Sequence, residues 1–426
     1  LYWRILTPLE EIKTKQVNLL AIKSREPISL HNQSHLICST MWSNVVVVSV
    51  LFCGSIAAVA SYSDGSVRFA VDFFKHAYTA RQNAILAPIA IRSLLAMMHH
   101  VATPDAARIL RDGLYLPADG LGVIEQTKLM MNRVNERKSM LEMMSRVYLP
   151  DAPLNPELVA HLRDNFGTGS EIVNFTEGSK VAECVNTWVN ESSRGMIPEF
   201  LKADELSADV TLLLINVMVM NASWGFFDEQ ETKKQTFHFL NGDHEVDMMK
   251  VDGTLTRMYL EDLMTDAIKL PYGWGSDLSM VILLPREGVN LEHVIKHFTV
   301  DHYKQLVLLD NKPQWHRQIW LGVPRFKIEQ KLDAQTTLEK MGLETLFGQA
   351  AFQVLATRLS KLGQVKQSAF IKVDEQGTQA AAAAAIQSLV VSGISNVDVH
   401  RPFMYIIRKE STKDILFIGH YSNYEE

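Results

Sequence analysis

The stretch Val373-Asp374-Glu375-Gln376-Gly377-Thr378-Gln379 runs into six consecutive alanines, residues 380–385, and then into an almost uncharged segment that reaches Asn396. Soluble linkers are rich in proline, serine, lysine and glutamate, whereas this segment has no proline or lysine. It carries no bulky apolar side chain between Gly377 and Ile386, so it can be exposed as a loop or can join a sheet as a strand. An alanine-rich helix is the alternative, because alanine has the highest helix propensity. The flanking sequences decide between these interpretations.

The two flanks of this segment both favour strands. Upstream, Ala369-Phe370-Ile371-Lys372-Val373 has the pattern of a buried strand and ends at Glu375-Gln376-Gly377. Downstream, the sequence from Val397 to Arg408 is followed by Ile415-Leu416-Phe417-Ile418-Gly419, which predicts the last buried strand of the chain. The alanine-rich segment is therefore predicted to be a loop.

This arrangement resembles the hinge and reactive loop of a serpin, a serine-protease inhibitor that works by changing shape. Further motifs follow the family's order and spacing from Ser61 onward. They are Asn216-Val217-Met218-Val219-Met220 leading to Trp224, Leu270-Pro271-Tyr272, Ser279-Met280-Val281-Ile282-Leu283-Leu284-Pro285, Pro324-Arg325-Phe326-Lys327-Ile328-Glu329, and Leu338-Glu339-Lys340-Met341-Gly342-Leu343, the last of which predicts a helix that ends in a glycine cap.

The resemblance implies an α+β serpin fold, with one large and predominantly antiparallel central sheet, additional sheets, surrounding helices and an exposed reactive loop. The chain has 426 residues, of which 47% are hydrophobic and 21% charged, and this composition supplies enough apolar material for a large core. We expect residues 61–426 to form a single serpin domain, with the reactive loop at about residues 375–400, and to be monomeric.

The first sixty residues have a different character. Met41 is the first methionine, and the apolar run of residues 45–53 precedes Ala58-Val59-Ala60, a small-x-small ending typical of a secretory signal peptide. The run is too short to cross a membrane comfortably. We therefore expect residues 41–60 to be a signal peptide, and residues 1–40, which have no clean periodicity and no family match, to be upstream sequence that is not native to the protein.

Secretion would determine which cysteines the mature chain keeps and whether its glycosylation motifs can be used. Cys38 and Cys53 precede the expected cleavage site, so the mature chain keeps Cys184 and can form no intramolecular disulfide. The helical pattern around Cys184 predicts a buried thiol. Three Asn-x-Ser/Thr motifs are candidate glycosylation sites, with the third ranked last because it follows a strand: Asn174, Asn190 and Asn221.

Charge and motif content narrow the classes of partner and activity. The formal net charge is −6, which argues against a nucleic-acid role. Some serpins bind heparin on a helix that corresponds to a predicted helix of this chain. Here the helix mixes basic and acidic residues, so neither a glycosaminoglycan nor a membrane is an expected partner. The basic residues are Lys128, Arg133, Arg137 and Lys138, and the acidic residues are Glu125, Glu136 and Glu142.

Motifs for catalysis and for cofactor binding are missing from the sequence. It has no G-x-S-x-G elbow, no phosphate-binding loop, no dinucleotide fingerprint, no H-E-x-x-H and no C-x-x-C. The pairs His99-His100 and His31/His35 lack ligand spacing with carboxylates or cysteines. We expect a protein that is not an enzyme, binds no cofactor or metal, and acts through the active site of another protein.

The resemblance implies how the loop would act. The catalytic serine of a target protease attacks a loop carbonyl and forms an acyl-enzyme. The freed side of the loop then inserts into the main sheet, an established case of strand addition. Glu375 and Gly377 begin the expected hinge, and by the family register alternate residues then face the core, while Gln379 faces the opposite side. The inward positions are small and uncharged, so insertion buries no unpaired ion: Thr378, Ala380, Ala382 and Ala384.

The family's usual spacing from the hinge glycine places the reactive bond between Val391 and Ser392. There is no lysine or arginine between Lys372 and Arg401, which disfavours a trypsin-like target. Val391 suits the shallow apolar pocket of an elastase-like protease. Two neighbouring cut sites stay open and would favour chymotrypsin-like enzymes: Leu389 and Val390.

Departures from the family occur in a polar cluster that controls the opening of the main sheet in serpins. The family usually has serine at the positions of Ala87 and Ala90 and histidine at that of Gln367, and it shares Asn216 with this chain. Each lost hydroxyl removes a hydrogen bond worth about 0.5–1.5 kcal/mol. We therefore expect sheet opening to be altered.

Together these patterns predict a secreted, extracellular suicide-substrate inhibitor of elastase-like or chymotrypsin-like serine proteases, which traps the acyl-enzyme by loop insertion. The alternative, motivated by the altered cluster, is a non-inhibitory serpin that acts as a binding, carrier or chaperone protein.

The signal-peptide interpretation predicts the first residue of the mature chain. Protein secreted by cells that express the sequence from Met41 should begin at Ser61, because Ala58 and Ala60 are the small residues that signal peptidase requires. Amino-terminal sequencing of the secreted material makes the measurement, with an Ala60→Arg variant as the control that should block this cut. A secreted product that still carries residues 41–60 would contradict the signal-peptide interpretation, and secretion of residues 1–40 from cells that express the whole sequence would contradict both expectations about this region.

Overall fold

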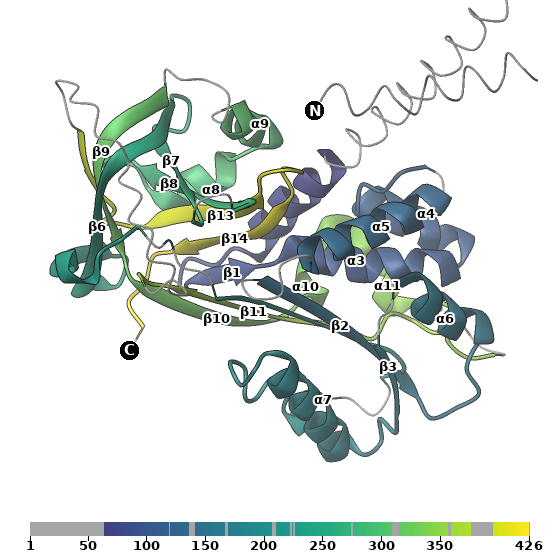
Figure 1. The fold of residues 1–426 in the computed structure, drawn as a ribbon. Coiled ribbons are helices and arrows are strands. Elements are labelled where there is room, and N and C mark those ends of the chain that lie inside the picture. The colour runs from purple at the N-terminus through teal and green to yellow at the C-terminus, as the bar shows by residue number, and fades with distance from the viewer. Residues whose placement is uncertain are drawn as a thin grey trace, which may run out of the picture. The chain divides into compact units, whose positions relative to one another are not determined.

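A computed structural model describes residues 64–118, 120–135, 141–166, 169–206, 210–221, 224, 226–273, 276–308, 315–356, 359–375 and 395–425. All of them belong to one compact unit, Ala60–Glu426. The described part of the chain folds as two sheets with helices packed around them (Figure 1).

Within the described residues, the sheet that contains the strand before the predicted loop has five strands in the order β10-β11-β4-β2-β3. The sheet is mixed: β11 pairs with β4, and β2 with β3, in parallel, whereas the other two pairings are antiparallel. Its strands are β10 (Phe326–Asp333), β11 (Gln364–Val373), β4 (Leu213–Asn221), β2 (Leu141–Pro150) and β3 (Gly169–Val173).

The second sheet has nine strands among the described residues, and it is antiparallel except where β12 pairs with β9. Eight strands follow the order β1-β14-β13-β8-β7-β6-β9-β12, and β5 pairs with β6. Its strands are β1 (Ala84–Leu86), β5 (Lys233–Phe239), β6 (Gly242–Leu260), β7 (Thr265–Pro271), β8 (Leu278–Pro285), β9 (His316–Pro324), β12 (Ser395–Asp398), β13 (Phe403–Lys409) and β14 (Ile415–Tyr421).

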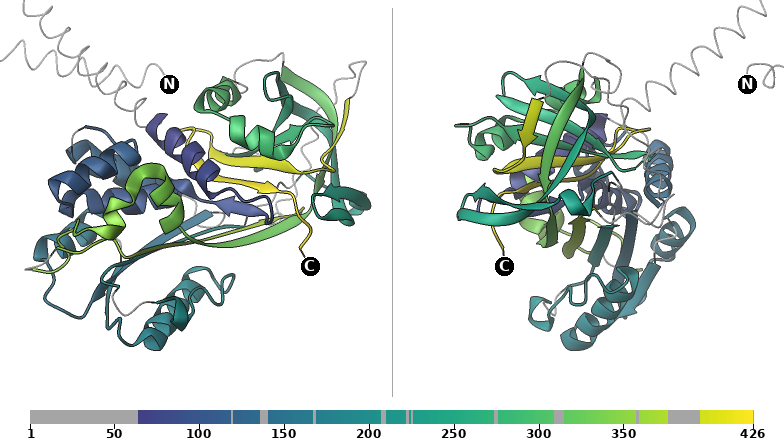
Figure 2. Two further views of the ribbon diagram at one scale, coloured as in Figure 1. Left: turned by 180° about the vertical axis from the view of Figure 1, so that it is seen from behind. Right: turned by 60° about the vertical axis from the view of Figure 1, so that its left-hand side comes forward.

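Helices lie on both faces of the five-stranded sheet, and α8 packs against β13 of the nine-stranded sheet (Figure 1). A helix over residues 64–77, α3, α4, α5, α10 and α11 gather on one side of it, and α7 packs on the other side (Figures 1 and 2). Their bounds are α3 (Pro88–Met98), α4 (Pro104–Gly113), α5 (Gly120–Asn135), α6 (Pro156–His161), α7 (Gly178–Ser192), α8 (Leu291–His297), α9 (Val300–Leu308), α10 (Gln335–Leu338) and α11 (Thr345–Gly348). None of the helices in the described ranges has the length and apolar character needed to cross a membrane.

Local sequence explains several of these boundaries. The Thr103 side chain accepts a hydrogen bond from the Ala106 amide and so caps α4, whose first residue is Pro104. Gly342 has a φ of 87°, a left-handed conformation that glycine adopts without strain, and it interrupts the helical segment as the sequence predicts.

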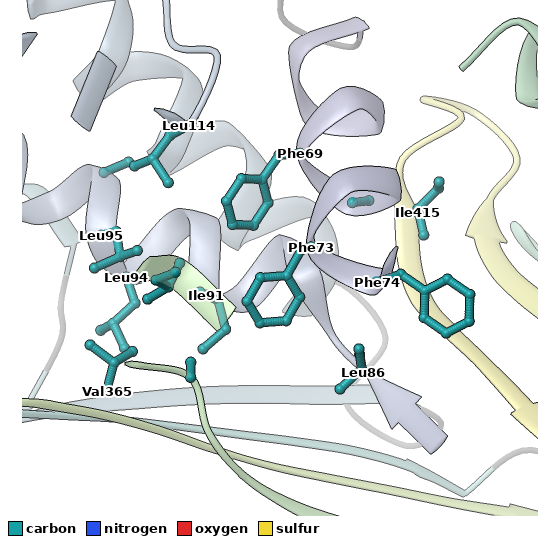
Figure 3. Packing of buried hydrophobic residues seen from close by; sticks show 14 of the residues in the cluster. Phe69, Phe73, Phe74, Leu86, Ile91, Leu94, Leu95, Leu114, Val365 and Ile415 are labelled. Carbon is teal, nitrogen blue, oxygen red and sulfur yellow. The ribbon is translucent and has the colours of Figure 1, made fainter. Parts of the chain in front are cut away.

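Alternation along the strands creates three apolar clusters. The largest lies among the helices and the sheets, and Phe69, Phe73, Ile91 and Leu94 pack at its centre (Figure 3). A second cluster fills the space between the two sheets, and a third joins α7 to the other face of β2, β4 and β11. The α+β class is therefore confirmed, with a large predominantly antiparallel sheet and a second, mixed sheet.

Candidate functional site at the β4–β11 seam

Strands β4 and β11 lie side by side as a parallel pair in the five-stranded sheet (Figure 1). Their register runs without a break from Gln364 opposite Leu213 to Lys372 opposite Asn221. The strand β11 leads into the predicted reactive loop, and β12 follows that loop. We call this pairing the β4–β11 seam.

The side chain of Gln367 joins the seam to helix α3. Its Oε1 atom accepts a hydrogen bond from the Ala87 amide at 3.0 Å, and its Nε2 atom donates to the Ala87 carbonyl at 2.9 Å. Ala87 is the N-cap residue of α3, and its own side chain makes no capping hydrogen bond. The amide of Gln367 thus supplies polar contacts to this buried corner, although Ala87 and Ala90 have no hydroxyl groups. The sequence expectation considered the loss of hydroxyls but missed this replacement.

Polar groups beside the seam are only partly satisfied. The Nδ2 atom of Asn216, which lies opposite Gln367, donates to the Met144 carbonyl at 3.1 Å and to Ser145 Oγ at 3.0 Å. Within the described part of the chain, neither Asn216 Oδ1 nor Ser368 Oγ has a hydrogen-bond partner, although both atoms are buried. A buried polar atom without a partner costs about 1–3 kcal/mol. The closed seam therefore retains unfavourable free energy.

An ion pair holds the end of β11 at the point where the hinge begins. The side chain of Glu375 is 2% exposed, and Arg325 donates to it from Nε at 3.0 Å and from Nη2 at 2.8 Å. The hydroxyl of Thr232 donates a third hydrogen bond to the same carboxylate. Arg325 lies between β9 and β10, so the contact ties the two sheets to the base of the predicted loop.

The protonation of Glu375 reflects these contacts. Burial raises the pKa of Glu375, but the hydrogen bonds from Arg325 and Thr232 lower it by more, so the pKa lies below its ordinary value. The sequence expectation assigned Glu375 to the hinge and missed its two partners. The signal that could have indicated Arg325 is its place in the Pro324-Arg325-Phe326 motif, where a charged residue stands between two apolar ones.

Most of the predicted loop residues lie outside the described residues. This applies to the reactive bond and to the hinge positions after Glu375: Gly377, Thr378, Ala380, Ala382, Ala384, Val391 and Ser392. The structure thus brings together Ala87, Gln367 and Asn216 at the seam and places Glu375 at its end.

The predicted glycosylation sites occupy different settings. Asn174 is exposed after β3, and its Oδ1 atom accepts hydrogen bonds from the amide and the hydroxyl of Thr176, the third residue of its motif. Asn190 is exposed on α7. Asn221 is the last residue of β4, and its side chain is outside the described set.

Cys184 is half-buried on α7 rather than fully enclosed, because its helix face meets the edge of the third apolar cluster. Burial raises the pKa of its thiol, which disfavours the reactive thiolate at neutral pH. Among the described residues, no three His, Cys, Asp or Glu side chains are grouped to hold a metal ion. Lys128 and Arg133 fall on α5, whereas Arg137 and Lys138 fall outside the described ranges.

The ion pair predicts a pH-dependent contribution to stability. Replacing Glu375 by glutamine should lower the free energy of unfolding by about 1.5–3 kcal/mol at pH 7, because it removes a charged acceptor from Arg325 and Thr232. The folded-state pKa of Glu375 is lowered, so the contribution is complete above about pH 4.3, the ordinary value, and is lost as the pH falls through the folded-state pKa. The difference between the two proteins should shrink accordingly in thermal unfolding followed from pH 7 to pH 3.

A matched control is available beside the same guanidinium. The carboxylate of Glu229 lies 3.8 Å from Arg325 Nη2, and its side chain is 64% exposed. Exposed pairs of this kind contribute about 0–1 kcal/mol, so Glu229→Gln should change stability little. Equal effects of the two substitutions would show that the buried contact of Glu375 contributes no more to the free energy of unfolding than the exposed contact of Glu229.

Comparisons with known proteins agree with this architecture. The family described as "Serpin (serine protease inhibitor)" matches residues 64–424. Serine protease inhibitor 42Dd of Drosophila melanogaster is 30% identical over 341 residues, which cover 78% of this chain and 89% of that protein. Leukocyte elastase inhibitor of Sus scrofa is 31% identical over 279 residues, which cover 63% of this chain and 73% of that protein.

Solved structures give the same result for the fold. The structure of SRPN18 from Anopheles gambiae has a TM-score of 0.78 at 23% identity and covers 86% of this chain and 99% of its own. Native protease nexin-1, solved with heparin, has a TM-score of 0.74 at 22% identity and covers 86% of this chain and 100% of its own. The family match, the relatives and the shared fold lead to one conclusion: this chain belongs to the serpin family.

Proposed function

We propose that the protein is a suicide-substrate inhibitor of serine proteases. A target protease cleaves the reactive loop near Val391–Ser392, and the loop then inserts into the β4–β11 seam before the acyl-enzyme is hydrolysed. The protein itself carries out no catalysis. The description of the family and the printed names of the two relatives support the general activity.

The parallel pairing of β4 with β11 is the observation that carries this proposal. A strand that continues from β11 and turns back between the two would run antiparallel to both of them. Insertion would replace one parallel ladder by two antiparallel ladders, which are slightly more stable for each residue. The sequence between β11 and β12 is suited to form this strand, because it has small residues and no proline.

The hinge composition supports the insertion step. Thr378 and the alanines at 380, 382 and 384 are the positions that would face the core by the family register. None of them brings a charge into the sheet, and their small volume lowers the steric barrier to opening the seam. Gly377 supplies the backbone freedom for the turn.

The loop sequence also limits the class of protease. Between Lys372 and Arg401 there is no basic residue that could pair with the carboxylate at the base of a trypsin-like specificity pocket. Val391 suits an elastase-like enzyme, and Leu389 or Val390 would suit a chymotrypsin-like enzyme. We further propose that the protein is secreted and is glycosylated at two exposed motifs: Asn174 and Asn190.

A non-inhibitory serpin is the second candidate, and the observation that motivates it is the pair of hydrogen bonds between Gln367 and Ala87, which we call the Gln367–Ala87 clamp. These two hydrogen bonds tie β11 to α3 and must adjust when the seam opens. If they hold the sheet closed for longer than the acyl-enzyme survives, the loop is cut without trapping. The protein would then act as a binding, carrier or chaperone protein.

Incubation with proteases of known specificity separates the two candidates. Purified protein should form a complex with pancreatic elastase or chymotrypsin that survives denaturing electrophoresis, and it should form none with trypsin. Cleavage of the loop without a stable complex would support the non-inhibitory candidate. A loop that none of these enzymes cuts would contradict the proposed reactive bond.

The register of the hinge predicts the effect of a charge at its first inward position. Replacing Thr378 by arginine should lower the yield of covalent complex by about tenfold or more, because burial of an unpaired charge costs several kcal/mol and slows insertion. The loop should still be cut. Gln379→Arg is the matched control, since this position faces the opposite side of the inserted strand, and it should retain most of the complex. Similar yields for the two variants would contradict the register.

Cleavage of the loop should raise the thermal stability of the protein. An inserted strand of about a dozen residues gains ladder hydrogen bonds worth about 0.5–1.5 kcal/mol each, which corresponds to a rise in Tm of about 10 °C or more. Melting curves before and after limited proteolysis, with the cut mapped by mass spectrometry, make the measurement. The cleaved Thr378→Arg variant is the control that should show a smaller rise. An unchanged Tm after a cut near Val391 would mean that the loop does not insert.

A further inference from the structure

A tryptophan is exposed in the middle of β9. The side chain of Trp320 is 48% accessible to solvent, although Ile319 and Leu321 on either side of it are buried in the core. Large aromatic residues at a surface leave apolar area in contact with water, and such residues are enriched among those that dominate the affinity of protein interfaces. Among the described residues, the neighbours of Trp320 thus leave about half of its surface in contact with solvent.

Two strands flank Trp320 and surround it with polar groups. It lies opposite Asp252 on β6 and opposite Asn396 on β12. Both neighbours are exposed, and Asp252 Oδ1 accepts a hydrogen bond from Gln318 Nε2 at 2.6 Å. The three strands thus form one hydrogen-bonded surface with the indole at its centre, and we call this surface the platform.

A second carboxylate stands beside this platform. Asp398 on β12 pairs with Gly322 on β9, and a Cβ atom at Gly322 would lie 2.3 Å from Asp398 Oδ1. The glycine therefore makes room for the carboxylate two residues from Trp320. With Asp252 and Asp398 against Lys250, the outer face of these strands carries more negative than positive charge.

The position of β12 places this face close to the proposed reactive bond. Asn396 lies four positions after Ser392, so even a fully extended chain spans only about 14 Å between them. A protease domain of about 230 residues has a radius of gyration of about 17 Å. A protease seated on Val391–Ser392 is therefore large enough to reach strand β12 and its neighbour β9.

We propose that Trp320, with Asp252, Asn396 and Asp398 around it, forms a second contact surface for the protease that attacks the reactive loop. This inference rests on the proposed function. The indole provides a flat apolar anchor, and the two carboxylates select a protease whose surface beside the active-site cleft carries arginine or lysine. The target would thus be chosen by the loop and by this platform together.

The test measures how fast pancreatic elastase cleaves the loop. In the full-length protein, Trp320→Ala should lower kcat/KM for loop cleavage by about tenfold, in the range found when a central interface residue is truncated. The number of inhibitor molecules consumed for each trapped protease should stay unchanged, because insertion follows docking and does not involve β9. Trp320→Thr provides a second variant that suits an outward strand position, and thermal unfolding checks that both variants fold.

Ile172→Ala is the matched control, since Ile172 is 58% exposed on β3, in the other sheet. It should leave kcat/KM unchanged. Asp252→Asn should lower kcat/KM by a smaller factor and weaken its dependence on ionic strength. Equal rates for the parent and both Trp320 variants would overturn the inference.

Failure of the proposed function would look different from failure of this inference. If the parent protein is cut at the loop but traps no protease, the inhibitory function fails, and the cleavage rates still test the platform. If the parent traps the protease and the Trp320 variants react at the same rate, the function holds and the platform is excluded.

Discussion

Strands β4 and β11 run parallel along an uninterrupted register, and β12 is the next described strand after β11 in the sequence. This arrangement constrains the rest of the molecule. The two helical layers cover the two faces of the sheet, so a new strand can enter only along the plane of the sheet. The proposed change of shape would exchange the one parallel ladder between β4 and β11 for two antiparallel ladders.

Polar contacts around the seam act in opposite directions. Gln367 ties β11 to the start of α3, and Arg325 with Thr232 holds Glu375 at the end of the strand, so these contacts stabilise the observed position of β11. The unpaired Oδ1 atom of Asn216 and the unpaired hydroxyl of Ser368 disfavour it. Since each contribution is on the order of 1–3 kcal/mol, the balance is close.

The nine-stranded sheet holds the chain on the far side of the predicted loop. It anchors the far end of the loop through the pairing of β12 with β9, and its outer face carries Trp320 beside that anchor. The inner face of the same strands packs into the core between the two sheets. Stability and partner recognition can thus vary independently on opposite faces of β9, because alternate residues of a strand point to opposite sides.

The sequence alone determined the α+β class, the strands on both sides of the alanine-rich segment, the glycine cap at Gly342 and the candidate positions at the seam. The strands and the glycine cap follow from local periodicity and from residue types that have strong conformational preferences. The α+β class and the candidate positions at the seam follow from the resemblance to serpins. It did not indicate the Gln367–Ala87 clamp, the partners of Glu375 or the exposure of Trp320. The clamp joins residues 280 positions apart, and the Arg325–Glu375 pair joins residues 50 positions apart. Only the tertiary structure decides such contacts, because they depend on the register and packing of strands that local sequence patterns do not specify.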